Sequence, residues 1–505
     1  MIADLKPYPE LRDSGVEWLG EVPAHWDVRR LAQFGTLSKG SGGSKDDERS
    51  AGVPCVRYGD LYTTHHNFIQ GSRSFISNER VAEYTPTRYG DVLFASSGET
   101  IDEIGKSAVN IMREDACCGG DVIIFRPTQR VDARYLGYVM DCRPVAAEKA
   151  RMGRGITVMH IYGAQLKCLM IPLPPLMEQT EIARFLDHAN RRIERYIGAK
   201  KKLIALLEKH KQALIHEAVT GRIDVRTGRP YPAYKESGVE WLGTVPAHWE
   251  VWRSKRAFRP RTERARPGDI QLSATQAYGV IAQADYEEKI GRKVTRILRH
   301  LDQRRHVEIG DFVISMRSFQ GGLERAWTSG CIRSSYIVLH AATELIVGYF
   351  GHLFKSVGYI GALQSTANFI RDGQDLNFDN FCRVDVPFPP VEEQQHIAQA
   401  VDRGTDYIDA SIERSRRQIV SLREYRERLI ADVVTGKLDV RKAAAGLPDT
   451  DSLGVEDDPA DNGDHDAADP SGRQVVDERS TYGMGELPGG GTQARQGQRR
   501  PHGAA

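Results

Sequence analysis

Several short motifs of this chain resemble catalytic motifs, but none has the complete spacing that its chemistry requires. Residues 105–107, Gly-Lys-Ser, look like the end of a phosphate-binding loop, yet such a loop needs a glycine five residues before Gly105, where the chain has Thr100. The Pro-Pro pairs at 174–175 and 389–390 lack the preceding Asn or Asp with which an amino-methyltransferase holds its target base. The histidines, carboxylates and cysteines show neither metal-ligand nor acid–base spacing. We therefore expect no catalytic residues, no metal site and no cofactor in this chain, which would not be an enzyme by itself.

A larger set of side chains has the chemistry for contacting DNA. Arg and Lys bind phosphates and guanine edges, Asn and Gln bind adenine, and small polar groups bind either. In the first half of the chain the candidates are Lys39, Lys45, Arg57, Tyr58, His66, Asn67, Ser97, Lys106, Arg151 and Arg154. In the second half they are Arg259, Arg261, Arg264, Arg266, Gln276, Tyr278, Arg317, Gln320 and Arg371. For any single one of them, a solvated surface residue is the better interpretation, so the prediction concerns the group.

Charge is divided unevenly along the chain. The 505 residues carry a net charge of +1, but the segment from Asp449 onward has 12 acidic and 5 basic residues, which leaves +8 on the rest. A moderately basic body permits nucleic-acid binding without requiring it. Residues 442–505 are rich in Gly, Asp and Pro and poor in apolar residues, a composition that predicts a disordered acidic tail.

Membrane and secretion signals are missing from the sequence. No run approaches the roughly 18 apolar residues of a membrane span, and the first residues do not form a cationic start followed by an apolar core. Seven cysteines, an odd number without CxxC spacing, fit reduced thiols. We expect a cytoplasmic protein with no membrane partner.

The elements that must position these residues occur in two copies. SGVEWLGEVPAHW at 14–26 recurs as SGVEWLGTVPAHW at 237–249, with twelve of thirteen positions identical. Segment 172–226 recurs at 387–441, with 20 of 55 positions identical. A repeat of this length means that the chain is a tandem pair of one unit.

Each copy contains a long helical segment after its Pro-Pro pair. The first runs without proline from Glu178 to Thr220, and Gly221 is a plausible stop, matched by Gly436 in the second copy. Apolar residues recur with coiled-coil spacing at Ile182, Leu186, Ile193, Ile197, Ile204, Leu207 and Leu214, and again at Ile397, Val401, Ile408, Ile412, Ile419, Leu422 and Leu429. So narrow a stripe on a polar helix needs a partner helix. We predict that the two helices, each about 65 Å long, pack together in antiparallel fashion.

The remaining segments read as mixed α and β structure. Short apolar runs such as VLFAS (92–96) and FVISM (312–316) predict buried strands that follow Gly-Asp turns. The predicted fold class is α+β: two mixed α/β domains separated by two long helices packed as an antiparallel coiled coil, in a pseudo-two-fold tandem repeat. The predicted segments are a first domain at 1–171, a helix at 172–222, a second domain at 223–386, a helix at 387–441 and the tail at 442–505.

The tandem plan resembles the specificity subunit of a type I restriction–modification system. The resemblance rests on the repeated SGVEWLG-x-VPAHW motif, on LPPLMEQ at 173–179 with its counterpart FPPVEEQ at 388–394, and on the AVTGxID ending of the helix, and it covers about residues 1–441. It implies two target recognition domains that each read one half of an asymmetric bipartite DNA site. It also implies helices that dock two modification subunits, with restriction subunits in the same complex. S-adenosylmethionine, ATP and Mg²⁺ would then belong to those partners.

Two other functions fit parts of this pattern. One is a coiled-coil scaffold whose paired domains bind proteins, and the other is a stand-alone transcription factor, for which the chain lacks a helix-turn-helix signature before the long helices. A strong salt dependence of DNA affinity would separate DNA recognition from a protein scaffold, because counterion release accompanies phosphate contacts.

Overall fold

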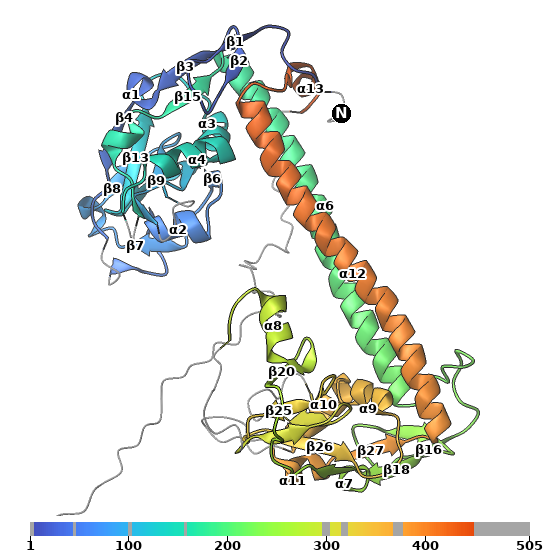
Figure 1. Cartoon of the computed structure of the whole chain (residues 1–505). Coiled ribbons are helices and arrows are strands. Elements are labelled where there is room, and N and C mark those ends of the chain that lie inside the picture. Colours follow the sequence, from blue (N-terminus) through green and yellow to red (C-terminus); the bar gives the residue numbers. More distant parts are fainter. Residues whose placement is uncertain are drawn as a thin grey trace, which may run out of the picture.

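The computed structural model describes residues 5–43, 47–98, 104–155, 159–294, 303–314, 322–366 and 377–448. Within these ranges, two mixed α/β domains lie at opposite ends of a pair of long helices and project to the same side of it (Figure 1). Four candidate contact residues, Lys45, Arg317, Gln320 and Arg371, lie outside the described residues, and so does the predicted tail from residue 449 onward. The prediction of a disordered tail is wrong for residues 442–448, because this part continues the short helix α13 (Arg441–Ala445) and buries Ala444 and Leu447 in the core of the first domain.

The long helices are α6 (Leu176–Val219) and α12 (Val391–Val434), each of 44 residues and hence about 66 Å long. Each begins directly after the second proline of its Pro-Pro pair, because proline fixes an extended approach and has no N–H to donate within a helix. Each ends two residues before a glycine with positive φ, Gly221 (73°) or Gly436 (79°), the conformation that commonly terminates helices. Both helices end just before their predicted glycine stops, and they lie within the predicted segments 172–222 and 387–441, whose first four residues are not helical.

The two long helices lie side by side and run in opposite directions (Figure 1). Three ion pairs join them, namely Glu194 with Arg426, Glu208 with Arg416 at 3.5 Å, and Lys211 with Asp409 at 2.6 Å. Residue numbers rise along one helix as they fall along the other, which fixes the antiparallel direction.

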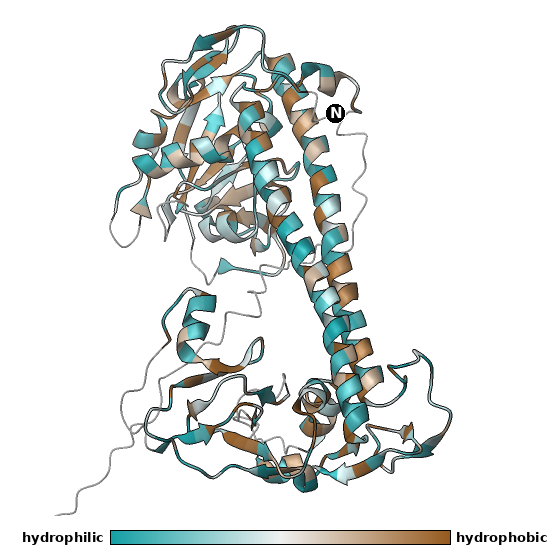
Figure 2. Cartoon of the chain, turned by 45° about the vertical axis from the view of Figure 1, so that its right-hand side comes forward, coloured by the Kyte–Doolittle hydropathy of each residue, from teal (hydrophilic) through white to brown (hydrophobic). Residues whose placement is uncertain are grey.

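The stripe residues turn inward on both helices. Ten of them are buried: Ile182, Leu186, Ile193, Ile197, Ile397, Val401, Ile408, Ile412, Ile419 and Leu429. The other four, Ile204, Leu207, Leu214 and Leu422, are partly buried. Figure 2 shows hydrophobic and hydrophilic residues alternating along both helices, the pattern that one apolar stripe on each helix produces.

The first domain is built on two sheets. Its five-stranded sheet has the order β4 (Gly35–Lys39), β13 (Val122–Pro127), β9 (Val92–Ala95), β11 (Ser107–Asn110) and β6 (Phe68–Ile69). Its four-stranded sheet has the order β7 (Ser74–Ile76), β5 (Val53–Val56), β12 (Ala116–Cys118) and β8 (Thr85–Thr87). The other elements are α1 (Leu31–Phe34), α2 (Tyr58–Thr63), β10 (Ser97–Gly98), α3 (Ala133–Asp141), α4 (Arg143–Met152), β14 (Met159–His160) and α5 (Gly163–Leu166). Every residue of β9 and β11 is buried, so these strands form the centre of the domain.

The second domain has a smaller sheet. Its four strands have the order β19 (Phe258–Pro260), β26 (Ile337–Ala341), β23 (Phe312–Ile314) and β24 (Glu324–Arg325). Two further pairs are β20 (Leu272–Thr275) with β21 (Gly279–Ala282), and β22 (Arg305–Val307) with β25 (Gly330–Ile332). The helices are α7 (Ser254–Ala257), α8 (Gln283–Ile290), α9 (Val347–Leu353), α10 (Val357–Ser365) and α11 (Phe378–Cys382). The two domains therefore differ in their described sheets as well as in their sequences.

Equivalent antiparallel strand pairs lie where each domain meets the helices. They are β1 (Leu11–Asp13) with β2 (Glu21–Pro23), β3 (Asp27–Arg30) with β15 (Met170–Leu173), β16 (Tyr234–Glu236) with β17 (Thr244–Pro246), and β18 (Glu250–Arg253) with β27 (Asp385–Phe388). The sequence repeat is thus a repeat of the parts that face the helix pair.

The core of each domain includes the start of one long helix and the end of the other. The first core contains Ile182 of α6 and Val433 of α12, and the short helix α13 (Arg441–Ala445) packs on α6 there. The second core contains Ile397 of α12 and Val219 of α6. Continuous apolar packing therefore holds both domains to the helix pair.

Candidate nucleic-acid interface and its supporting junctions

A buried carboxylate joins the first domain to the start of α6. Glu178 accepts a hydrogen bond of 2.5 Å from the Tyr8 hydroxyl and lies 2.7 Å from Nε2 of His25. Burial, followed by the hydrogen bond to Glu178, raises the pKa of Tyr8, so the phenol remains a donor at neutral pH. The next residue, Gln179, donates to the Pro174 carbonyl at 2.7 Å and accepts from the backbone N–H of Asp132 at 2.9 Å. The Glu-Gln pair of LPPLMEQ therefore fixes the angle at which the domain meets the helix.

The second junction repeats this arrangement. Glu393 accepts from the Tyr231 hydroxyl, lies 2.8 Å from Nε2 of His248 and accepts from Nε1 of Trp249 at 3.1 Å. Gln394 donates to the Pro389 carbonyl at 2.8 Å. The tyrosine and histidine partners of the two glutamates are equivalent residues of the repeat. The indole contact differs, because Trp249 donates to Glu393 whereas the buried Nε1 of Trp26 has no hydrogen-bond partner among the described residues.

The tryptophans of the repeated motif pack against the end of the other long helix. Trp26 and Trp249 are fully buried. A Cβ atom on Gly436 would lie 2.3 Å from Pro23, and one on Gly221 would lie 2.5 Å from Pro246, distances that only glycine permits. Trp26 and Trp249 therefore have a packing role at the two junctions.

Removing the junction carboxylate should loosen one end of the molecule. We expect Glu393→Ala to lower the free energy of unfolding of the second domain by about 2–3 kcal/mol, because hydrogen bonds to a charged group are lost and a buried donor is left unpaired. Hydrogen exchange of residues 231–249, followed by mass spectrometry, would report the loss. Glu392→Ala is the matched control, because Glu392 is exposed; equal protection in the two variants would contradict the role of Glu393.

The candidate contact residues of the first domain fall into two groups. Lys106 pairs with Asp141 at 2.5 Å, Arg57 lies 3.5 Å from Glu48, and Asn67 donates to the Gly137 carbonyl at 3.2 Å, so these three have partners within the domain. The exposed candidates are Lys39, Tyr58, His66, Arg151 and Arg154, and Ser97 is half-buried. Arg151 lies 3.4 Å from Glu148, and the backbone of Arg154 pairs with that of His160.

Two of the candidates line a hollow in the first domain. Lys39, at the end of β4, and Ser97, in β10, border a cavity of about 420 Å³ together with His160, Tyr162 and Lys167. The strand pair β10–β14 brings this set together, since Ser97 and His160 are directly opposed. The rings of His160 and Tyr162 stack with their centroids 6.3 Å apart, and Tyr162 is 57% exposed. Two lysines, serine hydroxyls and aromatic rings around one hollow, which Asp121 also lines, suit a phosphate and a base edge.

His160, Tyr162 and Lys167 are absent from the predicted set. The sequence carries a weak signal for them, because the aromatic residues of HIY (160–162) follow closely on the basic run RMGRG (151–155). Their meeting with Lys39 depends on pairing between strands far apart in the sequence, which spacing along the chain does not reveal.

Two of the four clustered arginines of the second domain are bound within the domain. Arg261 donates two hydrogen bonds to Asp311, at 2.7 and 2.9 Å. Arg266 pairs with Glu263 at 2.6 Å and with Glu308 at 2.7 Å. Arg259 and Arg264 are exposed on the strand β19 and in the segment that follows it.

An aromatic and basic patch lies around the turn between β20 and β21. Gln276 is exposed in this turn, and the ring of Tyr278 lies 5.2 Å from the ammonium of Lys289. Trp327, which sequence reasoning missed, is 54% exposed and lies against Gly279, where a Cβ atom would come within 2.9 Å of its Nε1. The patch offers an amide and aromatic faces to a ligand, whereas the hollow in the first domain offers lysines and a serine.

A buried lysine supports strand β11 of the five-stranded sheet. Lys149 in α4 is fully buried and donates to the Gly105 carbonyl at 2.6 Å, the Met140 carbonyl at 2.9 Å and the Ser107 hydroxyl at 3.0 Å. Gly105 adopts a positive φ of 71°, which turns its carbonyl toward the ammonium. Residues 105–107 therefore serve to anchor β11, which explains a Gly-Lys-Ser sequence without a phosphate-binding loop.

The described residues contain neither a metal-binding cluster nor a membrane-spanning helix. No group of three or more His, Cys, Asp or Glu side chains in this part of the chain is placed to hold a metal ion. None of the described helices is both long and apolar enough to cross a membrane.

The chain is similar to known proteins over most of its length. Residues 23–204 match the model of the type I restriction modification DNA specificity domain. The MjaX type I restriction enzyme specificity subunit of Methanocaldococcus jannaschii is 23% identical over 84% of this chain and 96% of its own length. The EcoKI type I restriction enzyme specificity subunit of Escherichia coli is 18% identical over 83% of this chain and 90% of its own length.

The fold is shared with a chain from a structure that concerns complex assembly and conformational transition of the type I R-M system. That chain is 17% identical, with a TM-score of 0.57, over 83% of the present chain and 99% of its own length. The mixed α/β class, with two domains and long helices, is therefore confirmed. The resemblance that the motifs predict is confirmed by the sequence matches, since residues 23–204 fit the specificity domain model and the matching relatives are type I restriction enzyme specificity subunits. The prediction of a specificity subunit rather than an enzyme is likewise confirmed, because the relatives are named as specificity subunits of type I restriction enzymes.

Proposed function

We propose that this subunit recognises an asymmetric bipartite site on double-stranded DNA, with one half-site read by each domain. The observation that carries the proposal is the contrast between the junctions and the domains. Glu178 and Glu393 have equivalent tyrosine and histidine partners at the two ends, whereas the hollow of the first domain and the patch of the second have different chemistry. Two domains that share one kind of junction but present different surfaces suit a DNA target whose two halves differ in sequence.

The helix pair is a spacer between the half-sites in this proposal. We take it to be an antiparallel coiled coil with an approximate two-fold axis at its centre. Two ion pairs support this symmetry, because the repeat relates Glu194 to Asp409 and Arg426 to Lys211, so the pair Glu194–Arg426 is equivalent to the pair Asp409–Lys211. A rod of about 66 Å corresponds to about two turns of B-DNA. That length accommodates two half-sites with unread base pairs between them.

Specific residues have the chemistry to read each half-site. Lys39 and Lys167 would contact phosphates, while Ser97 and His160 would meet base edges beside the stacked ring of Tyr162. In the second domain Gln276 has the bidentate amide that suits adenine, and the exposed Arg259 and Arg264 suit phosphates or guanine. Lys106, Arg261 and Arg266 already hold carboxylates, so their contribution would be to shape the surfaces.

The partners would supply the chemistry. In this proposal the long helices dock two modification subunits, and restriction subunits join the same complex in the cytoplasm. S-adenosylmethionine, ATP and Mg²⁺ would bind those partners and not the present chain.

Exchange of one domain tests independent reading of the half-sites. Replacing residues 250–385 with the corresponding segment of another specificity subunit exchanges β18 together with the domain. It keeps Tyr231, His248, Trp249 and Glu393, the residues that form the second junction. We expect methylation profiling of cells that also contain the modification subunits to show one changed half-site and one unchanged half-site. A change in both halves would contradict independent reading, and methylation without regard to sequence would contradict the proposal as a whole.

A further inference from the structure

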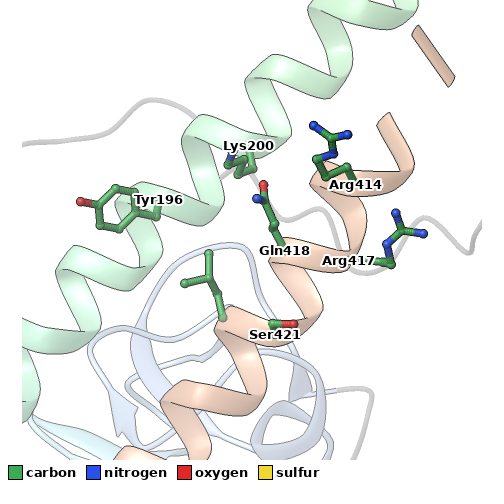
Figure 3. Close-up of a pocket in the computed structure, with 7 residues that line it drawn as sticks. Tyr196, Lys200, Arg414, Arg417, Gln418 and Ser421 are labelled. Carbon is green, nitrogen blue, oxygen red and sulfur yellow. The ribbon is translucent and has the colours of Figure 1, made fainter. Parts of the chain in front are cut away.

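A groove lies between the long helices on the side that faces away from both domains. Its volume is about 550 Å³, and it is lined by Tyr196 and Lys200 of α6 and by Arg414, Arg417, Gln418, Ser421 and Leu422 of α12 (Figure 3). Three cations, two aliphatic or aromatic side chains and no carboxylate border it. Such a surface suits an acidic segment that also carries some apolar residues.

The domains lie on the opposite side of the helix pair from this groove. In the first domain Arg134 pairs with Asp187 at 2.9 Å, and Glu194 follows Asp187 by seven residues, about two helical turns. At about 100° per residue, Tyr196 points some 200° away from Glu194. Arg416 pairs with Glu208 on the domain-facing side. Arg414 lies two residues before Arg416 and therefore points about 200° away from it, toward the groove.

The cations of the two sides differ in their partners. On the domain-facing side Lys211, Arg416 and Arg426 each pair with a carboxylate of the opposite helix. Within the described part of the chain, no carboxylate partners Lys200 or Arg417, two of the three cations that line the groove. A cationic groove with no acidic neighbour attracts an anion more strongly than a surface whose charges are already paired.

The chain itself supplies an acidic segment close to the groove. Residues 449–469 contain nine acidic residues and no Lys or Arg, and they include Leu453 and Val455. The described chain ends at Pro448, directly after α13, which lies on the side of the helix pair away from the first domain (Figure 1). Leu447 belongs to the same buried cluster as Phe185 of α6.

The distance from this end of the chain to the groove is short. Phe185 and Tyr196 are eleven residues apart, close to three full turns, so they lie on one face of α6 about 16 Å apart. An extended segment of about five residues spans that distance. The residues from Asp451 to Asp458 would then come level with Tyr196, Lys200 and the two arginines.

We propose that the acidic segment Asp449–Asp469 binds in this groove of its own chain. Its carboxylates pair with Lys200, Arg414 and Arg417, and Leu453 and Val455 cover the exposed ring of Tyr196 and the side chain of Leu422. The segment acts as a covering strand on the outer side of the helix pair. This inference is independent of DNA recognition, since it concerns the side that faces away from both domains.

Photocrosslinking in the full chain tests the proposal. We expect Tyr196→p-benzoylphenylalanine, in the isolated subunit, to crosslink to peptides from residues 449–469, identified by mass spectrometry. The matched control is the same substitution at Val420, which is 53% exposed and lies at the same level of the pair on the domain-facing side. The Arg414→Glu and Arg417→Glu double variant should lower the crosslink yield about fivefold, and adding Asp457→Lys and Asp458→Lys should restore it.

Other occupants of the groove give different results. A mixture of isotope-labelled and unlabelled chains shows whether the crosslink joins two copies, and mixed-mass products would overturn binding within one chain. Equal yields at positions 196 and 420, or no crosslink to the tail at position 196, would also overturn it. Circular dichroism of each variant checks that the long helices remain folded.

Discussion

Removing one heptad from each long helix should shorten the spacer of the recognised DNA site and leave both half-sites unchanged. Deleting residues 198–204 from α6 together with residues 413–419 from α12 keeps the apolar stripes of the two helices in register, because the deleted segments are equivalent under the 215-residue repeat. The ion pairs Glu194–Arg426 and Lys211–Asp409 also survive. Each helix loses about 10 Å, and the domains rotate by only about 20° relative to one another.

The expected change in the DNA site follows from these dimensions. At about 3.4 Å per base pair, a rod shorter by about 10 Å brings the half-sites closer by up to about three base pairs. Methylation profiling in cells that contain the modification subunits measures the spacer directly. Deleting residues 198–204 alone is the control, since it leaves α12 longer than its partner and should abolish methylation. An unchanged spacer in the double deletion would show that the helix pair does not set the separation.

Replacing Lys149 should destabilise the first domain more than any other single change considered for it. We expect Lys149→Met to lower the free energy of unfolding by about 3–5 kcal/mol, because the two carbonyls and the hydroxyl that bind the ammonium lose their donor inside the core. Pulse proteolysis in urea, with mass spectrometry of peptides from residues 104–152, would measure the loss. Arg151→Ala is the control on the same helix: Arg151 is exposed, and its loss should change stability by less than about 0.5 kcal/mol.

The same lysine gives the first domain a particular pH dependence. Burial lowers the pKa of Lys149 to about 8 from its ordinary value of 10.5. Between these two values the unfolded chain binds more protons than the folded chain, so the contribution of Lys149 to the free energy of unfolding rises with pH over this window. The difference in stability between the parent and Lys149→Met should therefore widen above about pH 8. A constant difference from pH 7 to pH 10 would contradict the depressed pKa.

The long helices were predictable because their signals are local and repeated. Proline before the first turn, glycine after the last, and an apolar residue every three or four positions lie within one segment, and the second copy confirms each of them. The burial of Ile193, Ile197 and Ile419 at the centre of the pair follows from that pattern. The junctions were partly predictable, since the repeat marked the motif but not the role of Glu178.

The contact surfaces could not be read in the same way. Lys106 and Arg261 look like free cations in the sequence, but their partners Asp141 and Asp311 lie 35 and 50 residues away. The hollow in the first domain depends on the pairing of Ser97 with His160. Lys149 lies between Glu148 and Arg151, in a polar segment whose sequence is typical of a solvated helix face. Contacts between residues far apart in the chain decide whether such side chains are buried, paired or free to bind a ligand. A single sequence does not reveal these contacts.

The shared cores have a consequence for the order in which the chain becomes folded during synthesis. The core of the second domain is complete once Val401 has emerged, because its helix contributions come from residues 215–219 and 397–401. The core of the first domain needs Leu429 to Leu447, although most of it is made first. Domains usually fold from the N-terminus onward as the ribosome delivers them. Here the domain that is translated first is completed last. The apolar residues of its core that pack on α12 and α13 therefore remain uncovered through most of the synthesis of the chain.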